Sequence, residues 1–166
     1  MRFYLILEKN IKPVISLKHN LVKIYAGGFI NFMPCILFII SGILEFATGT
    51  SWGTFGILIP IVIDIFEKNN YPIMIISMSA CMSGAVCGDH CSPISDTTIM
   101  SSAGAKAEHM EHVLTQLPYA LLCAFIASIS YIVAGFTKSE FISLGTGIIL
   151  LVIFLAAIKK FEKKIR

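Results

Sequence analysis

The chain has 166 residues, of which 56% are hydrophobic and 14% are charged, and its mean hydropathy is +0.82. Soluble domains carry charge on about a quarter of their residues, so a water-soluble core could not hide this much apolar surface. The net charge of +3 does not indicate nucleic-acid binding, because the basic residues flank apolar spans and form no continuous stripe. We therefore expect a membrane protein whose surroundings are the lipid bilayer and which has no nucleic-acid partner.

Residues 1–23 form a basic segment, in which Arg2 and four lysines are interspersed with apolar side chains. This pattern predicts a cytoplasmic segment, helical and partly at the membrane interface, with a disordered tail as the alternative. Residues 24–44 are 21 uncharged residues, enough to cross a hydrocarbon core of about 30 Å. Glu45 follows this run, and the sequence leaves open whether it faces a cavity or lies at the interface.

Two polar interruptions then divide the apolar sequence, and small hydroxyl and glycine residues between apolar arms predict unwound helices. The 20 uncharged residues 69–88 run directly into the second interruption without a polar linker. The first interruption consists of Thr48, Gly49, Thr50, Ser51, Trp52, Gly53 and Thr54; the second contains Asp89, His90, Ser92, Ser95, Asp96, Thr97 and Thr98.

The rest of the chain predicts a connector, two ordinary spans and a basic tail. Residues 106–112, with His109 and His112, are expected to form a solvated cytoplasmic turn, and 113–137 and 141–158 to cross the membrane. The basic tail 159–166 places the C-terminus in the cytoplasm, and the N-terminus is also expected there. The predicted fold is an all-α polytopic membrane protein with a transmembrane domain over 24–158 and about four crossings, two of them discontinuous helices. Since 24–66 and 70–104 are each longer than one crossing needs, either can instead be a span plus a re-entrant arm.

The second interruption has the chemistry of a site for a desolvated alkali cation. A charged group at bilayer depth costs about 3 kcal/mol or more, so Asp89, His90 and Asp96 are functional candidates by default. Unwound turns expose carbonyls, hydroxyls add neutral ligands, and a carboxylate offsets the dehydration of the cation. Because burial disfavours its charged form, the same carboxylate can take a proton when the cation leaves. The alternatives are a cytoplasmic loop, helix-capping carboxylates and hydroxyls, and a His90 that makes only a structural hydrogen bond.

Both interruptions resemble signature stretches of the NhaC-type sodium/proton antiporter family. The resemblance rests on 48–60 and 88–98 and continues through 101–105 and 115–120. It implies a secondary transporter of the bacterial inner membrane with a partial ion-transporter-type inverted-repeat fold. Sodium and protons would be its transported species, without a cofactor, and some relatives would move small carboxylates or amino acids. The family's chains are much longer, and their C-terminal part matches here. The resemblance therefore implies that an N-terminal half, carried on another chain if the gene is split, is needed for transport.

Two rival interpretations stay open at the level of sequence. Cys87, His90 and Cys91, together with His109 and His112, could hold zinc in a membrane-embedded metalloenzyme, although their spacing copies no structural zinc pattern. The chain could also be a non-transporting remnant. We expect a transporter rather than an enzyme, with no metal other than sodium. The sequence does not decide whether the chain forms a homo-oligomer.

Overall fold

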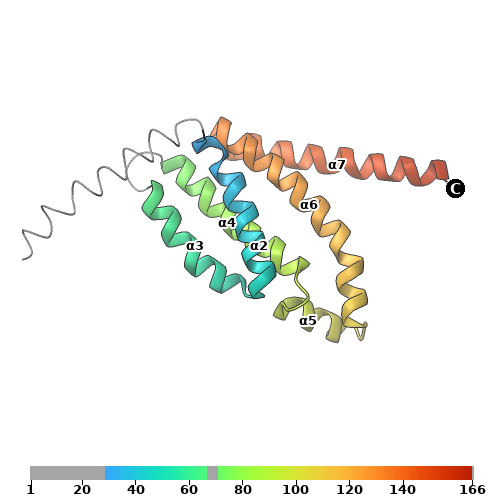
Figure 1. The fold of residues 1–166 in the computed structure, drawn as a ribbon. Helices are drawn as coiled ribbons and strands as arrows, with labels where there is room; N and C mark the ends of the chain where they lie inside the picture. Colours follow the sequence, from blue (N-terminus) through green and yellow to red (C-terminus); the bar gives the residue numbers. More distant parts are fainter. Residues whose placement is uncertain (1–28, 67–70, 166) are drawn as a thin grey trace, which may run out of the picture. The chain divides into compact units, whose positions relative to one another are not determined.

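The computed structural model of the chain describes residues 29–66 and 71–165, with side chains as far as residue 160. The basic segment 1–23 lies outside the described residues, and all contacts below lie within the unit that begins at Phe32. Within the described ranges every regular element is a helix, which confirms the all-α expectation. The elements are the 3-10 helix η1 (Ile30–Phe32) and the α-helices α2 (Met33–Thr48), α3 (Ser51–Phe66), α4 (Tyr71–Cys91), α5 (Asp96–Gly104), α6 (His109–Thr137) and α7 (Glu140–Ile165) (Figure 1).

Helices of membrane-spanning length account for most of the unit. In the described part of the chain, 4 helices are long and apolar enough to cross a bilayer: Ile30–Thr48, Tyr71–Cys91, His109–Thr137 and Glu140–Lys160. Helix α3 is shorter, with 16 residues, and at 1.5 Å per residue it is about 24 Å long. The expected polytopic membrane fold with about four crossings is confirmed.

The first interruption is a tight turn that reverses the chain. Gly49 has φ +68°, a left-handed conformation that only glycine adopts readily, and its N–H donates to the Glu45 carbonyl at 2.7 Å. The Thr50 hydroxyl accepts a hydrogen bond from the Gly53 N–H at 3.4 Å, so α3 begins at Ser51. Helices α2 and α3 therefore run in opposite directions (Figure 1). Of the two arrangements left open for 24–66, the structure has a span followed by a second arm.

Helices α2 and α4 pack closely because α4 presents small residues to α2. A Cβ atom on Gly84 would overlap the Phe38 carbonyl oxygen, and one on Gly88 would overlap the carbonyl oxygen of Gly42. The Ser41 hydroxyl also donates to the Cys81 carbonyl at 2.5 Å. Small residues at such positions let two helix backbones approach, as membrane helices commonly do. This packing places the last turns of α2 and α4 beside each other.

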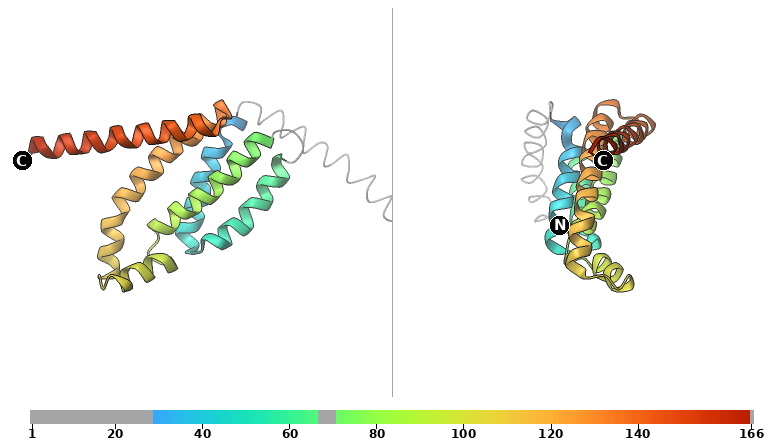
Figure 2. Two further views of the ribbon diagram at one scale, coloured as in Figure 1. Left: turned by 180° about the vertical axis from the view of Figure 1, so that it is seen from behind. Right: turned by 90° about the vertical axis from the view of Figure 1, so that its right-hand side faces the viewer.

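The second interruption also ends a full span. Helix α4 stops at Cys91, and after a short turn α5 runs for only 9 residues, too few to cross a bilayer. Figure 2 shows α5 next to the end of α4 and the start of α6 in both views. Helix α7 packs mainly against α6 and continues over residues 159–165. None of the 18-residue apolar window of α7 is buried within the unit.

Candidate ion-binding site

The centre of the second interruption is the carboxyl group of Asp89, in the last turn of α4, which is only 6% exposed. The Ser95 hydroxyl donates to its Oδ1 at 2.6 Å, and the Thr97 hydroxyl donates to its Oδ2. The Thr98 hydroxyl donates to the Asp89 backbone carbonyl at 3.2 Å, near the end of the helix, where this carbonyl also accepts from the Ser92 N–H at 3.4 Å. The start of α5 is thus folded back onto Asp89 by three hydroxyl groups.

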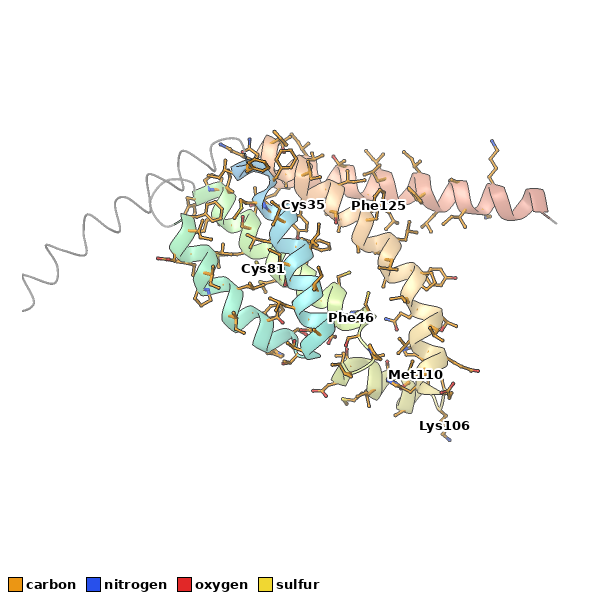
Figure 3. The ribbon with its side chains drawn as sticks, in the orientation of Figure 1. Cys35, Phe46, Cys81, Lys106, Met110 and Phe125 are labelled. Carbon is orange, nitrogen blue, oxygen red and sulfur yellow. The ribbon has the colours of Figure 1, made fainter. Side chains whose placement is uncertain are left out.

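The two interruptions meet in space. The Ser92 hydroxyl donates to the Phe46 carbonyl at 3.0 Å, and a Cβ on Gly49 would lie 2.8 Å from the Ile94 carbonyl oxygen. Figure 3 labels Phe46 at the end of α2 that faces this turn. The turn after α2 and the turn after α4 therefore form one structure, in which a glycine is required because there is no room for a side chain at Gly49.

Glu45, which the sequence left undecided between cavity and interface, is completely buried in the last turn of α2. The Thr54 hydroxyl, from the first turn of α3, donates to its Oε2 at 3.1 Å. Its other oxygen, Oε1, has no hydrogen-bond partner among the described residues. The Glu45 side chain also lies against Gly88 of α4, the residue that precedes Asp89, since a Cβ on Gly88 would be 2.7 Å from Glu45 Cβ. The signal that could have identified Glu45 was a carboxylate at the end of an apolar span, which is a functional candidate by default.

Several residues predicted for the site lie at its edge. His90 is exposed and hydrogen-bonds through Nδ1 to the Val86 carbonyl at 2.8 Å. Because a carbonyl only accepts, Nδ1 carries the hydrogen. Asp96 is exposed in the first turn of α5, where a carboxylate is favoured by the helix dipole. In the first interruption, Thr48 and Thr50 are exposed, Ser51 and Gly53 are half-buried, and Trp52 is 84% exposed.

The start of helix α6 is hydrogen-bonded to α5 and to the turn that precedes α5. His109 Nε2 hydrogen-bonds to the Pro93 carbonyl at 2.7 Å, and its Nδ1 lies 3.0 Å from the Ser102 hydroxyl. His112 Nε2 lies 3.1 Å from the Ser101 hydroxyl. Both histidines therefore fix α5 to the start of α6. Among the described residues no three Cys, His, Asp or Glu side chains are placed to hold a metal ion, so the groups required by the zinc alternative are not brought together.

The site offers oxygen ligands and negative charge without a basic partner. Residues 29–66 and 71–105, which form α2 to α5, contain no Lys or Arg. The buried acids Glu45 and Asp89 are accompanied instead by hydroxyl and carbonyl groups. Hard cations bind to oxygen ligands of these kinds, and an anion would find no positive side chain on these four helices.

The long apolar helices define the chain as a helical multi-pass membrane protein. Two acids are buried where α2 and α4 end, and oxygen ligands surround them. The sequence model of the Na+/H+ antiporter family matches residues 11–136. The chain belongs to this family, as the resemblance of its two interruptions led us to expect. No solved structure matches the chain.

Three bacterial relatives illustrate the range of the family. An uncharacterised protein of Haemophilus influenzae is 49% identical over 130 residues, which are 78% of this chain and 25% of the relative. The malate-2H(+)/Na(+)-lactate antiporter of Bacillus subtilis is 38% identical over 59% of this chain and 21% of the antiporter. An uncharacterised Na(+)/H(+) antiporter of H. influenzae is 36% identical over 58% of this chain and 20% of the relative. The chain thus spans a quarter or less of the length of these relatives.

Proposed function

We propose that the chain carries an ion site of a secondary antiporter in the bacterial inner membrane, where Asp89 binds Na+ and a proton in turn. The observation that carries this proposal is the buried Asp89 carboxyl, which two hydroxyl groups contact and no Lys or Arg of α2 to α5 neutralises. A buried carboxylate needs a positive partner, and a proton or a desolvated Na+ supplies it. Exchange then follows from competition for one carboxyl group.

The hydroxyl groups suit both occupants of the site. A hydroxyl donates through its hydrogen and accepts through its oxygen, so Ser95 and Thr97 can solvate a bare carboxylate or turn their oxygens toward a cation. Thr98 keeps α5 attached to the end of α4. The exposed carboxylate of Asp96 adds negative charge close to the site, and charge of this sign attracts cations from solution.

Transport requires the rest of the carrier. Alternating access uses both structural repeats around one site, and this chain spans a quarter or less of its relatives. Large apolar side chains near the site are exposed, with Trp52 at 84% and Met100 at 74%. We expect the remaining part of the carrier, on this polypeptide or a second one, to cover them. Family and relatives support a transporter rather than an enzyme.

Exchange of a small carboxylate is the second candidate, because the Bacillus subtilis relative is named as a malate/lactate antiporter. A carboxylate substrate needs a positive partner, and α2 to α5 supply none. On the described helices the chemistry therefore favours the cation, and any organic anion would be bound by the remaining part of the carrier.

The test is Na+-driven proton movement in everted membrane vesicles of a strain without antiporters, followed by the fluorescence of a pH-sensitive dye. The chain is expressed alone and as a chimeric carrier, in which it replaces the matching 130 residues of the H. influenzae relative. We expect activity in the chimeric carrier and its loss in Asp89→Asn. The matched control is Asp64→Asn, an exposed acid of α3 outside the site. Full activity of an inserted Asp89→Asn variant would overturn the proposal.

A further inference from the structure

A second acid stands beside Asp89, and neither the family match nor the interruption pattern assigns it a role. Glu45 is 0% exposed, and its environment is built from two other helices. Thr54 of α3 donates to Oε2, and Gly88 of α4 lies so close that a Cβ there would be 2.7 Å from Glu45 Cβ. Any residue larger than glycine at position 88, directly before Asp89, would therefore overlap the Glu45 side chain and the Gly42 carbonyl oxygen.

One oxygen of Glu45 is left without a partner. Oε1 is fully buried and accepts no hydrogen bond from any described residue, whereas leaving a buried charged oxygen unpaired costs several kcal/mol. The carboxyl group of Asp89, which follows Gly88 in α4, has no hydrogen to donate when it is ionised. Two states would satisfy a buried carboxylate pair of this kind: a proton on the Glu45 carboxyl that is donated to Asp89, or a cation held between the two carboxylates.

The net charge of the Glu45–Asp89 pair also favours a protonated state and a Na+-bound state. Two buried carboxylates at this junction of α2 and α4 repel each other, and neither α2, α3, α4 nor α5 carries a Lys or Arg that could compensate them. A shared proton leaves the pair with one negative charge, and a bound Na+ between two ionised carboxylates leaves the same net charge. The two occupied forms are electrostatically equivalent, so one can replace the other without a net change of buried charge.

We propose that Glu45 is the proton-carrying partner of Asp89, so that binding of Na+ between the two carboxylates releases the proton from Glu45. In the protonated form the Glu45 O–H donates to the Asp89 carboxylate. As Na+ enters, this O–H bond breaks, the proton leaves to solution, and its electron pair stays on the Glu45 carboxylate. One proton is released for each Na+ bound. The inference rests on the proposed function and refines it, because the proton that exchanges for Na+ at the Asp89 site is now carried by Glu45 and shared with Asp89, rather than carried by Asp89 alone.

The experiment uses the full chain reconstituted in lipid and, in parallel, the chimeric carrier. Binding of radioactive Na+ and release of protons into a weakly buffered, dye-containing medium are measured on the same samples. We expect about one proton per Na+ in the unaltered protein. Glu45→Gln keeps the shape but has no acidic proton, so Na+ should still bind, more weakly, while proton release falls close to zero. Asp89→Asn should abolish Na+ binding itself.

A second measurement does not depend on the folding of Glu45→Gln. Na+-induced infrared difference spectra should show the loss of a protonated-carboxyl band. Because Thr54 donates to the carbonyl oxygen of the protonated Glu45, Thr54→Val should shift this band to higher frequency. The control is Thr137→Val, whose hydroxyl bonds only to the Val133 carbonyl of its own helix.

The outcomes separate the two proposals. If neither the unaltered chain nor the unaltered chimeric carrier binds Na+ and releases protons, the proposed function is overturned together with this inference. Normal proton release in a folded Glu45→Gln variant, or a carboxyl band that Thr54→Val does not move, would overturn the assignment of the proton to Glu45 and leave Na+/H+ exchange at Asp89 standing.

Discussion

At the scale of single residues, the hydroxyl groups around Asp89 have two possible roles, as structural links and as ligands. Ser95 is the informative one, because its only described acceptor on another helix is Asp89 Oδ1, at 2.6 Å. Thr98 instead contacts the Asp89 backbone and ties α5 to α4. A change at Ser95 therefore reports on the carboxyl group with little effect on the attachment of α5.

We predict that Ser95→Ala lowers the apparent Na+ affinity of the chimeric carrier about tenfold, equivalent to about 1.4 kcal/mol, because a charged carboxylate loses one hydrogen bond. The measurement is the Na+ concentration that gives half-maximal dye response in everted vesicles. Ser128→Ala is the matched control, since that hydroxyl bonds only to the Ala124 carbonyl within α6. An unchanged half-saturation in Ser95→Ala would show that the hydroxyl has no part in ion binding.

At the scale of elements, the contact between α2 and α4 determines whether Glu45 and Asp89 stand side by side. Both acids lie in the last turns of these helices, and Gly84 and Gly88 set the distance between the two backbones. The obstacle to a larger residue at either glycine is backbone carbonyl oxygen, which cannot move away as a flexible side chain would. The site thus depends on helix packing at Gly88, the residue before Asp89, and at Gly84, about one turn earlier in α4.

We predict that Gly84→Ala destabilises the protein by about 1–3 kcal/mol, because its Cβ would overlap the Phe38 carbonyl oxygen and force α2 away from α4. The midpoint of heat-induced loss of the monodisperse peak in size-exclusion chromatography, in detergent, measures the effect. Gly56→Ala provides the comparison, because nothing lies within 4 Å of a Cβ there and alanine is the better helix former. Equal midpoints for both variants would refute the packing argument.

The sequence predicted the positions of the helices better than it predicted which helices pack against each other. Uncharged runs and polar interruptions were enough to place the spans, since hydrophobic length directly reflects the thickness of a bilayer. They did not show that the chain reverses at Gly49, because a glycine is equally compatible with an unwound helix and with a tight turn between two helices. For the same reason Glu45 stayed undecided: its burial depends on α3 folding back beside α2, which brings Thr54 to its carboxyl group.

The candidate site was likewise predicted in composition and only partly in geometry. Asp89, Ser95, Thr97 and Thr98 come together as one cluster, whereas Asp96 and His90 are exposed beside it. Neighbours in sequence point to different sides of a helix, so a run of polar residues at a helix end cannot all face the same point. Only the direction of α5 relative to α4 decides which of them reach the carboxyl group.

At the scale of the whole molecule, the positions of the basic residues predict which side of the membrane the site faces. Both interruptions and the connector that carries Lys106 lie at the same end of the unit, while the α6–α7 turn at Lys138 lies at the other end of α6 (Figure 1). Lys159 and Lys160 follow the apolar part of α7. Basic residues that follow a span tend to remain in the cytoplasm, so the positive-inside rule predicts that the Lys106 end, and with it the ion site, faces the cytoplasm.

We predict that alkaline phosphatase fused after Ala107 is inactive and that the same enzyme fused after Lys138 is active, because the phosphatase folds only outside the cytoplasm. A green fluorescent protein fused at the same positions should give the opposite pattern, which controls for the level of expression. This orientation would place the buried Asp89 at the cytoplasmic end of the unit. The reverse pattern of activities would contradict this orientation and place Asp89 at the outer end of the unit.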